Sequence, residues 1–132
     1  MKLSLATRYA LHAATYLAAQ KKDDAVASHI IAQSRGISER FLLKVLRPLV
    51  SARILTSIKG PNGGYRLARA SNDITMLEVL EAVEGPVRGD APSGKGEKDT
   101  ALGRRLNDVC NTHAEMTRKM LGKVKISELA GR

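Results

Sequence analysis

One stretch constrains the fold of this chain more than any other: two apolar-striped helices meet at Gly36 and a glycine-rich hairpin follows them. Ala32 is small where the helices would cross, and Gly36, four residues later, supplies the positive φ that a tight turn needs. Ile37, Leu42 and Val45 then repeat at the spacing that holds a second helix against the first. This pattern predicts a helix-turn-helix. The spacing alone does not exclude an ordinary pair of antiparallel helices.

The residues after the second helix of this pair favour a winged helix. Residues 54–58 are rich in β-branched side chains, and residues 65–67 can form the returning strand. Between them, Asn62-Gly63 is a strong signal for a hairpin turn. The glycine cluster lacks the Gly-Lys-Ser/Thr ending of a phosphate-binding loop, which disfavours a nucleotide site. We therefore expect a wing at about residues 54–68.

Helical periodicity predicts the remaining elements. Helices are expected over residues 3–20, 26–34, 75–83 and 98–123, with a short terminal turn at residues 126–130. The helix after Gly36, which carries Phe41, Leu42, Val45, Leu46 and Leu49, is the third helix in chain order. Val26, Ile30 and Ile31 form the expected inner stripe of the second helix. Thr75 and Glu78 have the spacing of a capping box at the start of the fourth.

Charge divides the chain into a basic first half and a neutral second half. Residues 1–70 hold twelve Lys and Arg against three Asp and Glu, whereas residues 71–132 hold ten of each kind. A polyanion, most simply nucleic acid, is the expected partner of the first half. Glycines and prolines gather in residues 86–97, the expected flexible loop between a winged domain at 1–85 and a long helix with its terminal turn at 98–132.

Several classes of protein are excluded by what the sequence lacks. Its single cysteine, Cys110, rules out an internal disulfide framework, a four-thiolate zinc site and a CxxC motif. No apolar run approaches the about 20 residues of a membrane span, and Arg8 and His12 interrupt the stretch that would form a signal peptide. No HExxH or GxSxG motif supports catalysis. We expect a cytoplasmic protein that is not an enzyme and has no membrane partner.

An apolar seam follows the long C-terminal helix. Its members step by four, three, four, three and four residues, which is typical of a helix that pairs with another helix. The seam consists of Leu102, Leu106, Val109, His113, Met116 and Met120. We expect it to join two copies of the chain. Packing of the seam on its own domain is the alternative, and both arrangements can hold along different parts of the helix.

The wing string at residues 59–67, Lys-Gly-Pro-Asn-Gly-Gly-Tyr-Arg-Leu, resembles that of the Rrf-type winged-helix transcription regulators, the group of IscR, NsrR and CymR. Residues 1–10, 37–42, 75–85 and 126–130 resemble the same family, so the resemblance covers nearly the whole chain. It implies a mainly α fold with a small β-hairpin wing and a long dimerisation helix that crosses its symmetry mate. The implied function is sequence-specific transcription regulation by a homodimer on a palindromic operator in double-stranded DNA. A winged-helix module that binds protein or RNA is the alternative.

The resemblance places the base-reading positions at the start of the third helix and at the wing tip. The candidate DNA-binding residues are Ser38, Glu39, Arg40, Phe41, Lys44, Lys59, Asn62 and Arg66. Arg40 and Lys44 are four residues apart and share a helix face, and Arg is the side chain best shaped to grip a guanine edge. Lys44 can read a base or hold a phosphate, and Glu39 can accept from cytosine. Lys59 and Arg66 suit phosphates or a minor groove.

Three residues bear on the third helix itself. Ser38 is its expected N-cap. Pro48 falls inside the helix, where it removes a hydrogen bond and predicts a kink. Arg53 stands where the family usually has a glycine, so we expect a strained end to the helix.

Many members of the family hold an iron–sulphur cluster with three cysteines in the loop and the early part of the long helix. Here Cys110 and His113 resemble the last cysteine and the histidine that follows it in IscR-type proteins, but the two upstream cysteines are absent. We therefore expect no conventional iron–sulphur cluster and no metal site. A cluster with atypical ligands, such as Asp90 or residues of a second subunit, stays open. Cys110 with His113 is also the candidate sensor pair, and plain packing of the thiol is the other interpretation.

Overall fold

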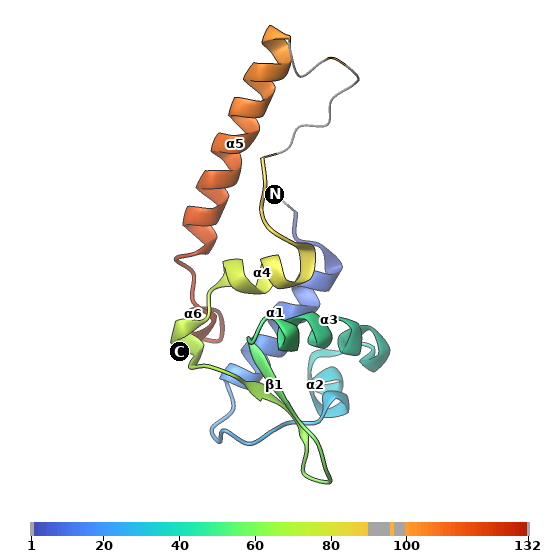
Figure 1. Ribbon diagram of the computed structural model, residues 1–132. Coiled ribbons are helices and arrows are strands. Elements are labelled where there is room, and N and C mark those ends of the chain that lie inside the picture. The colour runs from blue at the N-terminus through green and yellow to red at the C-terminus, as the bar shows by residue number, and fades with distance from the viewer. Residues whose placement is uncertain (1, 90–95, 97–99, 132) are drawn as a thin grey trace.

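The computed structural model describes residues 2–89, 96 and 100–131, which form a helical domain with a small hairpin and one long projecting helix (Figure 1). In chain order the elements are α1 (Leu5–Ala18), α2 (Ser28–Arg35), α3 (Glu39–Ser51), β1 (Leu55–Ile58), β2 (Gly64–Leu67), the 3-10 turn η1 (Ser71–Asp73), α4 (Met76–Glu84), α5 (Ala101–Leu121) and α6 (Ile126–Leu129). The predicted fold class is confirmed, since a hairpin follows a helix-turn-helix and a long helix comes near the end of the chain.

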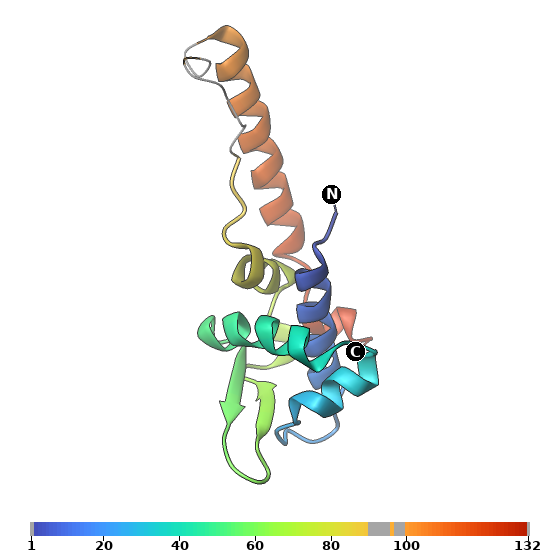
Figure 2. The same ribbon diagram turned by 90° about the vertical axis from the view of Figure 1, so that its right-hand side faces the viewer.

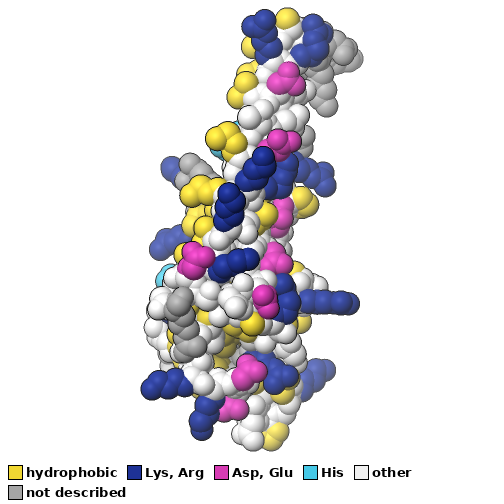
Figure 3. Space-filling view, turned by 90° about the vertical axis from the view of Figure 1, so that its left-hand side faces the viewer, with side chains coloured by type: hydrophobic (Ala, Val, Ile, Leu, Met, Phe, Trp, Pro, Cys, Tyr) yellow, Lys and Arg dark blue, Asp and Glu magenta, His cyan; other side chains and the backbone are white. Residues whose placement is uncertain are grey.

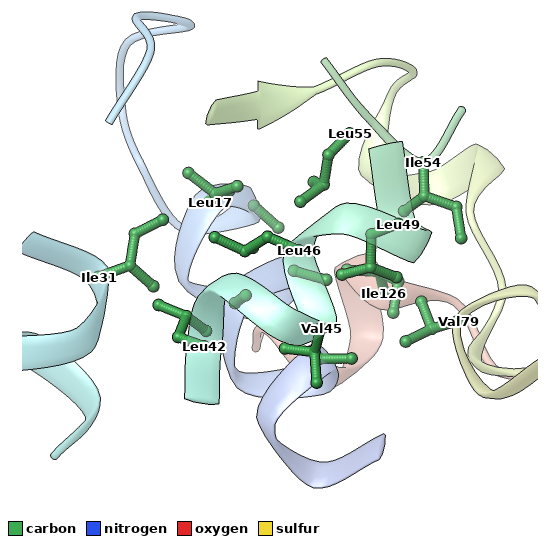
Figure 4. Close-up of a cluster of buried hydrophobic side chains, with 14 of the residues drawn as sticks. Leu17, Ile31, Leu42, Val45, Leu46, Leu49, Ile54, Leu55, Val79 and Ile126 are labelled. Atoms are coloured by element: carbon green, nitrogen blue, oxygen red, sulfur yellow. The ribbon is translucent and has the colours of Figure 1, made fainter. Parts of the chain in front are cut away.

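Helix α1 lies at the centre of the core. Ser4 caps it by accepting a hydrogen bond from the Thr7 N–H at 3.1 Å. Ala10, Ala13 and Ala14 are completely buried, and because they are small, α3, α4 and α6 can pack close to the α1 backbone. Aliphatic side chains from the surrounding elements fill the space between them (Figure 4). The core therefore needs no large aromatic residue.

The turn between α2 and α3 has the predicted geometry. Gly36 adopts a left-handed conformation with φ 64°, and the Ile37 N–H donates to the Ala32 carbonyl at 2.9 Å. Leu42 and Val45 are buried, as the helix-turn-helix spacing predicts. These contacts set the angle at which α3 leaves α2.

The start of α2 corrects the sequence-based prediction. The helix begins at Ser28, and Val26 instead forms an antiparallel bridge with Tyr65 of β2 through two backbone hydrogen bonds of 2.8 Å. Ile30, expected on the inner stripe, is 42% exposed, whereas Ile31 is fully buried. The predictions for Val26 and Ile30 are wrong because the hairpin pairs with the segment before the helix and so fixes where the helix starts.

The hairpin turn lies where the glycine-rich cluster predicts it. Strands β1 and β2 pair antiparallel over their whole length and are joined by the five residues 59–63. Within this loop the Gly63 N–H donates to the Gly60 carbonyl at 2.9 Å, so Pro61 and Asn62 are the central residues of the turn. Proline favours this position because its ring fixes φ near −65°. Asn62 and Gly63 therefore both lie in the connecting turn, as the sequence predicts.

The structure can be compared with the sequence predictions for α3 at its N-cap, at Pro48 and at Arg53. Ser38 occupies the N-cap position, but its hydroxyl makes no capping bond. The helix does not end at Pro48 and continues to residue 51. Arg53 has φ 61° and is the one residue other than glycine with positive φ in the described part of the chain. The strain expected at this position is confirmed.

The predicted capping box of α4 is confirmed, since Thr75 accepts from the Glu78 N–H at 3.1 Å and Glu78 accepts from the Thr75 N–H at 2.9 Å.

Helix α5 is attached to the domain near its C-terminal end. After α5 the chain returns to the start of α4, where the Ile126 N–H donates to the Ile74 carbonyl at 2.9 Å. From this attachment α5 extends over 21 residues, away from the hairpin, so that the two lie at opposite ends of the molecule (Figure 2).

The described start of the expected loop runs along α5. A Cβ added at Gly89 would lie 2.4 Å from the Asn111 Cα, and Arg118 donates a hydrogen bond to the Val87 carbonyl. Part of the loop lies outside the described residues, namely residues 90–95, with Asp90, and residue 97. The same holds for residues 98 and 99 of the predicted long helix. None of the helices described is both long and apolar enough to cross a membrane.

Candidate nucleic-acid interface

Helix α3 presents cations on the face opposite its buried stripe. The buried stripe consists of Leu42, Val45, Leu46 and Leu49. Arg40, Lys44 and Arg47 are all exposed and are spaced by four and three residues, which places them together on the other side of the helix. We call these three residues the cationic stripe. Sequence reasoning missed Arg47, although the same spacing would have found it.

The structure places every predicted DNA-binding residue on the surface. Ser38, Glu39, Arg40, Phe41, Lys44, Lys59, Asn62 and Arg66 are exposed. The first five lie at the N-terminal end of α3, where a recognition helix contacts base edges. The other three lie in the hairpin loop and on the outward side of β2. Figure 2 shows α3 lying across the domain, with α2 and the hairpin below it.

The hairpin is held at a fixed place beside α2. The bridge between Val26 and Tyr65 attaches β2 to the segment that leads into α2. Gly64 makes this contact possible, because a Cβ there would lie 2.3 Å from the carbonyl carbon and oxygen of Val26. The position of the wing relative to the helix-turn-helix thus depends on a backbone contact that only glycine allows.

Among the residues that the structure describes, the cations of α3 and the hairpin have no acidic partner. Arg40, Lys44, Arg47, Lys59 and Arg66 form no ion pair with any described carboxylate. Such charges are balanced in water by mobile counterions, and a phosphate backbone can replace those ions with an entropic gain. The arrangement therefore suits a polyanion.

Among these cations, one has an aromatic contact. The Lys44 Nζ lies 5.5 Å from the centre of the Phe41 ring, within the range of a cation–π interaction. Both side chains are exposed, so this contact lies on the surface of α3.

The apolar seam of α5 faces solvent. The exposed fractions are 60% for Leu102, 38% for Leu106, 65% for Val109, 65% for Met116 and 68% for Met120, and His113 is exposed as well. Figure 3 shows hydrophobic side chains along one edge of the projecting helix. The buried residues of α5 are Gly103, Ala114 and Leu121, which lie on another face. The alternative that the seam packs on its own domain is therefore wrong.

The candidate sensor pair lies at the border of this seam. Cys110 is half-buried and lies between the seam and the face that carries Ala114, while His113, one turn further along, is exposed in the seam itself. No hydrogen bond to either side chain is present among the described contacts. The geometry is compatible both with a thiol that packs at a helix contact and with one that reacts there.

Known proteins resemble this chain over nearly its whole length. A model of the Rrf2 family, described as an iron-dependent transcriptional regulator, matches residues 3–132. The chain belongs to the Rrf2 family. Its relatives include BadM of Rhodopseudomonas palustris, which is 38% identical over 111 residues covering 83% of this chain and 70% of that protein. The transcriptional regulator IscR of Cereibacter sphaeroides is 33% identical over 113 residues, covering 84% of this chain and 72% of that protein.

Solved structures agree with the family assignment. The structure of CymR (YrzC), the global cysteine regulator of B. subtilis, matches with a TM-score of 0.81 and 25% identity over 99% of this chain and 97% of that chain. The chain is therefore a winged helix-turn-helix transcription regulator of a DNA-binding family, and not an enzyme. The resemblance read from the wing string is confirmed.

The donor set of this chain does not fit a conventional iron–sulphur cluster. Such clusters are held mainly by cysteine thiolates, and Cys110 is the one cysteine in the sequence. The described residues contain no group of three or more His, Cys, Asp or Glu side chains placed to hold a metal ion. His113 offers one further donor on the next turn of α5, which still leaves the set incomplete within one subunit.

Proposed function

We propose that this Rrf2-family regulator acts as a homodimer that recognises a palindromic operator in double-stranded DNA. The observation that carries the proposal is the cationic stripe, which faces away from the core and lacks acidic partners among the described residues. A helix of this kind fits the major groove, where an Arg side chain can bind both acceptors of a guanine edge. We assign Arg40 this base-reading role, and Lys44 and Arg47 contacts to bases or phosphates.

The hairpin supplies the second part of the interface. Lys59 and Asn62 lie in its loop, and Arg66 projects from β2. Cations at a wing tip contact phosphates or enter the adjacent minor groove. Because the Val26 bridge fixes the hairpin beside α2, both parts would contact one stretch of duplex.

Dimerisation through the α5 seam completes the proposal. The seam from Leu102 to Met120 extends for about 27 Å at 1.5 Å per residue. Its five apolar members are each at least 38% exposed in the single chain, and a contiguous apolar stripe of this kind marks a surface that a partner covers. A second α5 with the same seam is the partner that fits the heptad-like spacing. Two α3 helices would then read half-sites about one helical turn, or a multiple of it, apart.

Sequencing the genomic DNA that co-purifies with the protein tests the DNA-binding role and supplies the operator. On that site we expect Arg40→Ala to cost about 1–3 kcal/mol and to relax sequence preference. Lys59→Ala should weaken specific and random DNA to a similar degree and reduce the salt slope by about 0.9 for each phosphate that is no longer neutralised. Lys123→Ala, which removes one charge after the end of α5, is the control and should leave the affinity unchanged.

Two outcomes would contradict this assignment. Equal losses on specific and random DNA for Arg40→Ala would remove its base-reading role. Weak duplex binding with a shallow salt dependence would instead favour a module that binds protein or RNA.

Sedimentation tests the dimer. Placing Asp at both Leu106 and Met116 should yield monomers that bind the operator poorly, because two linked half-site contacts become one. Asn at Arg105 and Lys119, which are exposed on the same helix outside the seam, changes the net charge by the same two units and is the matched control that should leave the dimer intact. A wild-type protein that sediments as a monomer at micromolar concentration would overturn the dimer.

The same regulator, we propose, works without a conventional iron–sulphur cluster. Anaerobic purification should give colourless protein, and a brown protein with stoichiometric iron and sulphide would refute this. The role of Cys110 as a sensor is tested by operator binding of wild type and Cys110→Ser before and after mild peroxide. Identical binding throughout would make the thiol structural.

A further inference from the structure

Two large apolar side chains of α3 lie on the surface. Phe41, the one phenylalanine of the chain, is 53% exposed, and Leu43 is 40% exposed. Neither belongs to the buried core or to the partly buried residues packed against it. The ring of Phe41 has a partner in Lys44. Leu43 therefore stands out as a leucine on the recognition helix that the fold itself does not use.

The helix geometry places Leu43 between two cations of the stripe. Residues three or four apart on a helix are neighbours on its surface, with Cβ atoms about 5–6 Å apart. Arg40 precedes Leu43 by three residues and Arg47 follows it by four, so Leu43 lies next to both. A duplex held by both arginines would cover Leu43 and remove it from water.

The chemistry of the major groove decides what can face a leucine there. The base edges carry amino groups, ring nitrogens and carbonyl oxygens, and one apolar group, the C5-methyl of thymine. A polar base edge pressed against Leu43 would lose its bound water without gaining a hydrogen bond. A thymine methyl would instead gain from burial against the leucine.

We propose that Leu43 selects thymine, through its C5-methyl group, at the base pair next to the one that Arg40 contacts. This inference rests on the proposed operator binding and adds the base that one further position of α3 recognises. The operator should accordingly carry a thymine beside the guanine read by Arg40, in each half-site.

The test uses the genomic site selected by the wild-type protein, with each thymine replaced in turn by deoxyuridine. This replacement removes the methyl group and keeps the base pairing. At one thymine in each half-site we expect the affinity to fall about fourfold, the value of burying one such group. At the remaining thymines the affinity should not change.

Variants of Leu43 then assign the effect to its side chain. Leu43→Ala should bind the thymine and deoxyuridine sites equally well, because the methyl has lost its apolar partner. Leu129→Ala is the matched control, since Leu129 of α6 is 44% exposed and of the same type, and it should keep the fourfold preference for thymine.

The possible failures are distinguishable. If the wild type selects a site but binds it equally well with deoxyuridine at every position, the role of Leu43 is overturned and the proposed function stands. Persistence of the thymine preference in Leu43→Ala would also overturn it. If the wild type selects no site at all, the proposed function fails, and this inference fails with it.

Discussion

The contact between the wing and the segment before α2 can be tested by adding one methyl group. In Gly64→Ala the new Cβ would lie 2.3 Å from the Val26 carbonyl atoms and 2.7 Å from the Ala27 nitrogen, all of them backbone atoms. Ordinary van der Waals contact begins near 3.4 Å, so the two segments would have to separate by roughly 1 Å. At that separation neither of the 2.8 Å hydrogen bonds between Val26 and Tyr65 can persist.

The magnitude follows from two contributions. Loss of both hydrogen bonds costs about 1–3 kcal/mol in total, at about 0.5–1.5 kcal/mol each. Alanine at the φ of Gly64, 145°, adds backbone strain of about 1–3 kcal/mol. Gly60 separates the two contributions, because it also has a positive φ, 108°, but a Cβ there would meet no atom within 4 Å. We therefore expect Gly64→Ala to destabilise the protein by about 2 kcal/mol more than Gly60→Ala.

Urea denaturation followed by circular dichroism measures this difference. The expected loss of about 2–6 kcal/mol is smaller than most of the usual total stability of about 5–15 kcal/mol. Operator affinity is measured on the same samples after the denaturation curves show that both variants are folded in buffer. Gly64→Ala should bind the operator more weakly than Gly60→Ala, since its wing is no longer held beside α2. Equal destabilisation by the two alanines would refute the argument, because it would mean that the bridge contributes nothing to stability.

Two further predictions concern a half-buried histidine and a strained arginine. Burial, then the positive charges of Arg35 and Arg8, lower the pKa of His12 below its usual 6.5. As the pH falls, the unfolded chain therefore takes up a proton at His12 before the folded chain does, so stability should fall as the pH drops through about 6.5. His12→Gln should flatten this part of a plot of the urea midpoint against pH. Parallel plots for the wild type and the variant would contradict the prediction. Arg53→Gly should raise the free energy of unfolding by about 0.5–1 kcal/mol, because glycine adopts the positive φ of this position without strain. Arg47→Gly, inside the helix, is the control and should lower the free energy of unfolding by about 1 kcal/mol. Urea denaturation would contradict the prediction if both variants lose stability.

Local geometry explains which predictions from sequence were correct. The positive φ at Gly36, the capping box of Thr75 and Glu78, and the exposed face of α3 each depend on residues within one or two turns of each other. Periodicity and capping rules describe such short-range contacts well. For the same reason, the spacing of Arg40 and Lys44 was sufficient to place both on one face of a helix.

Helical spacing in the sequence could predict only part of the candidate interface. Helical spacing was sufficient to identify the cations of α3, and attention to one more position would have included Arg47. The sequence could not predict that Leu43 is exposed, because the apolar stripe of a helix includes residues at this spacing. Only the packing of α3 against α1 shows on which side of the border it lies.

The sequence by itself determined the order of the main helices and the hairpin, the turn at Gly36 and the spacing of the α5 seam. Tertiary structure decided that Val26 pairs with Tyr65 instead of starting a helix, and that the α5 seam stays exposed instead of packing on its own domain. Both outcomes depend on segments far apart in the chain competing for the same backbone hydrogen bonds and the same buried area. Local periodicity contains no information about that competition, because it reports which side of an element is apolar and not which surface covers it.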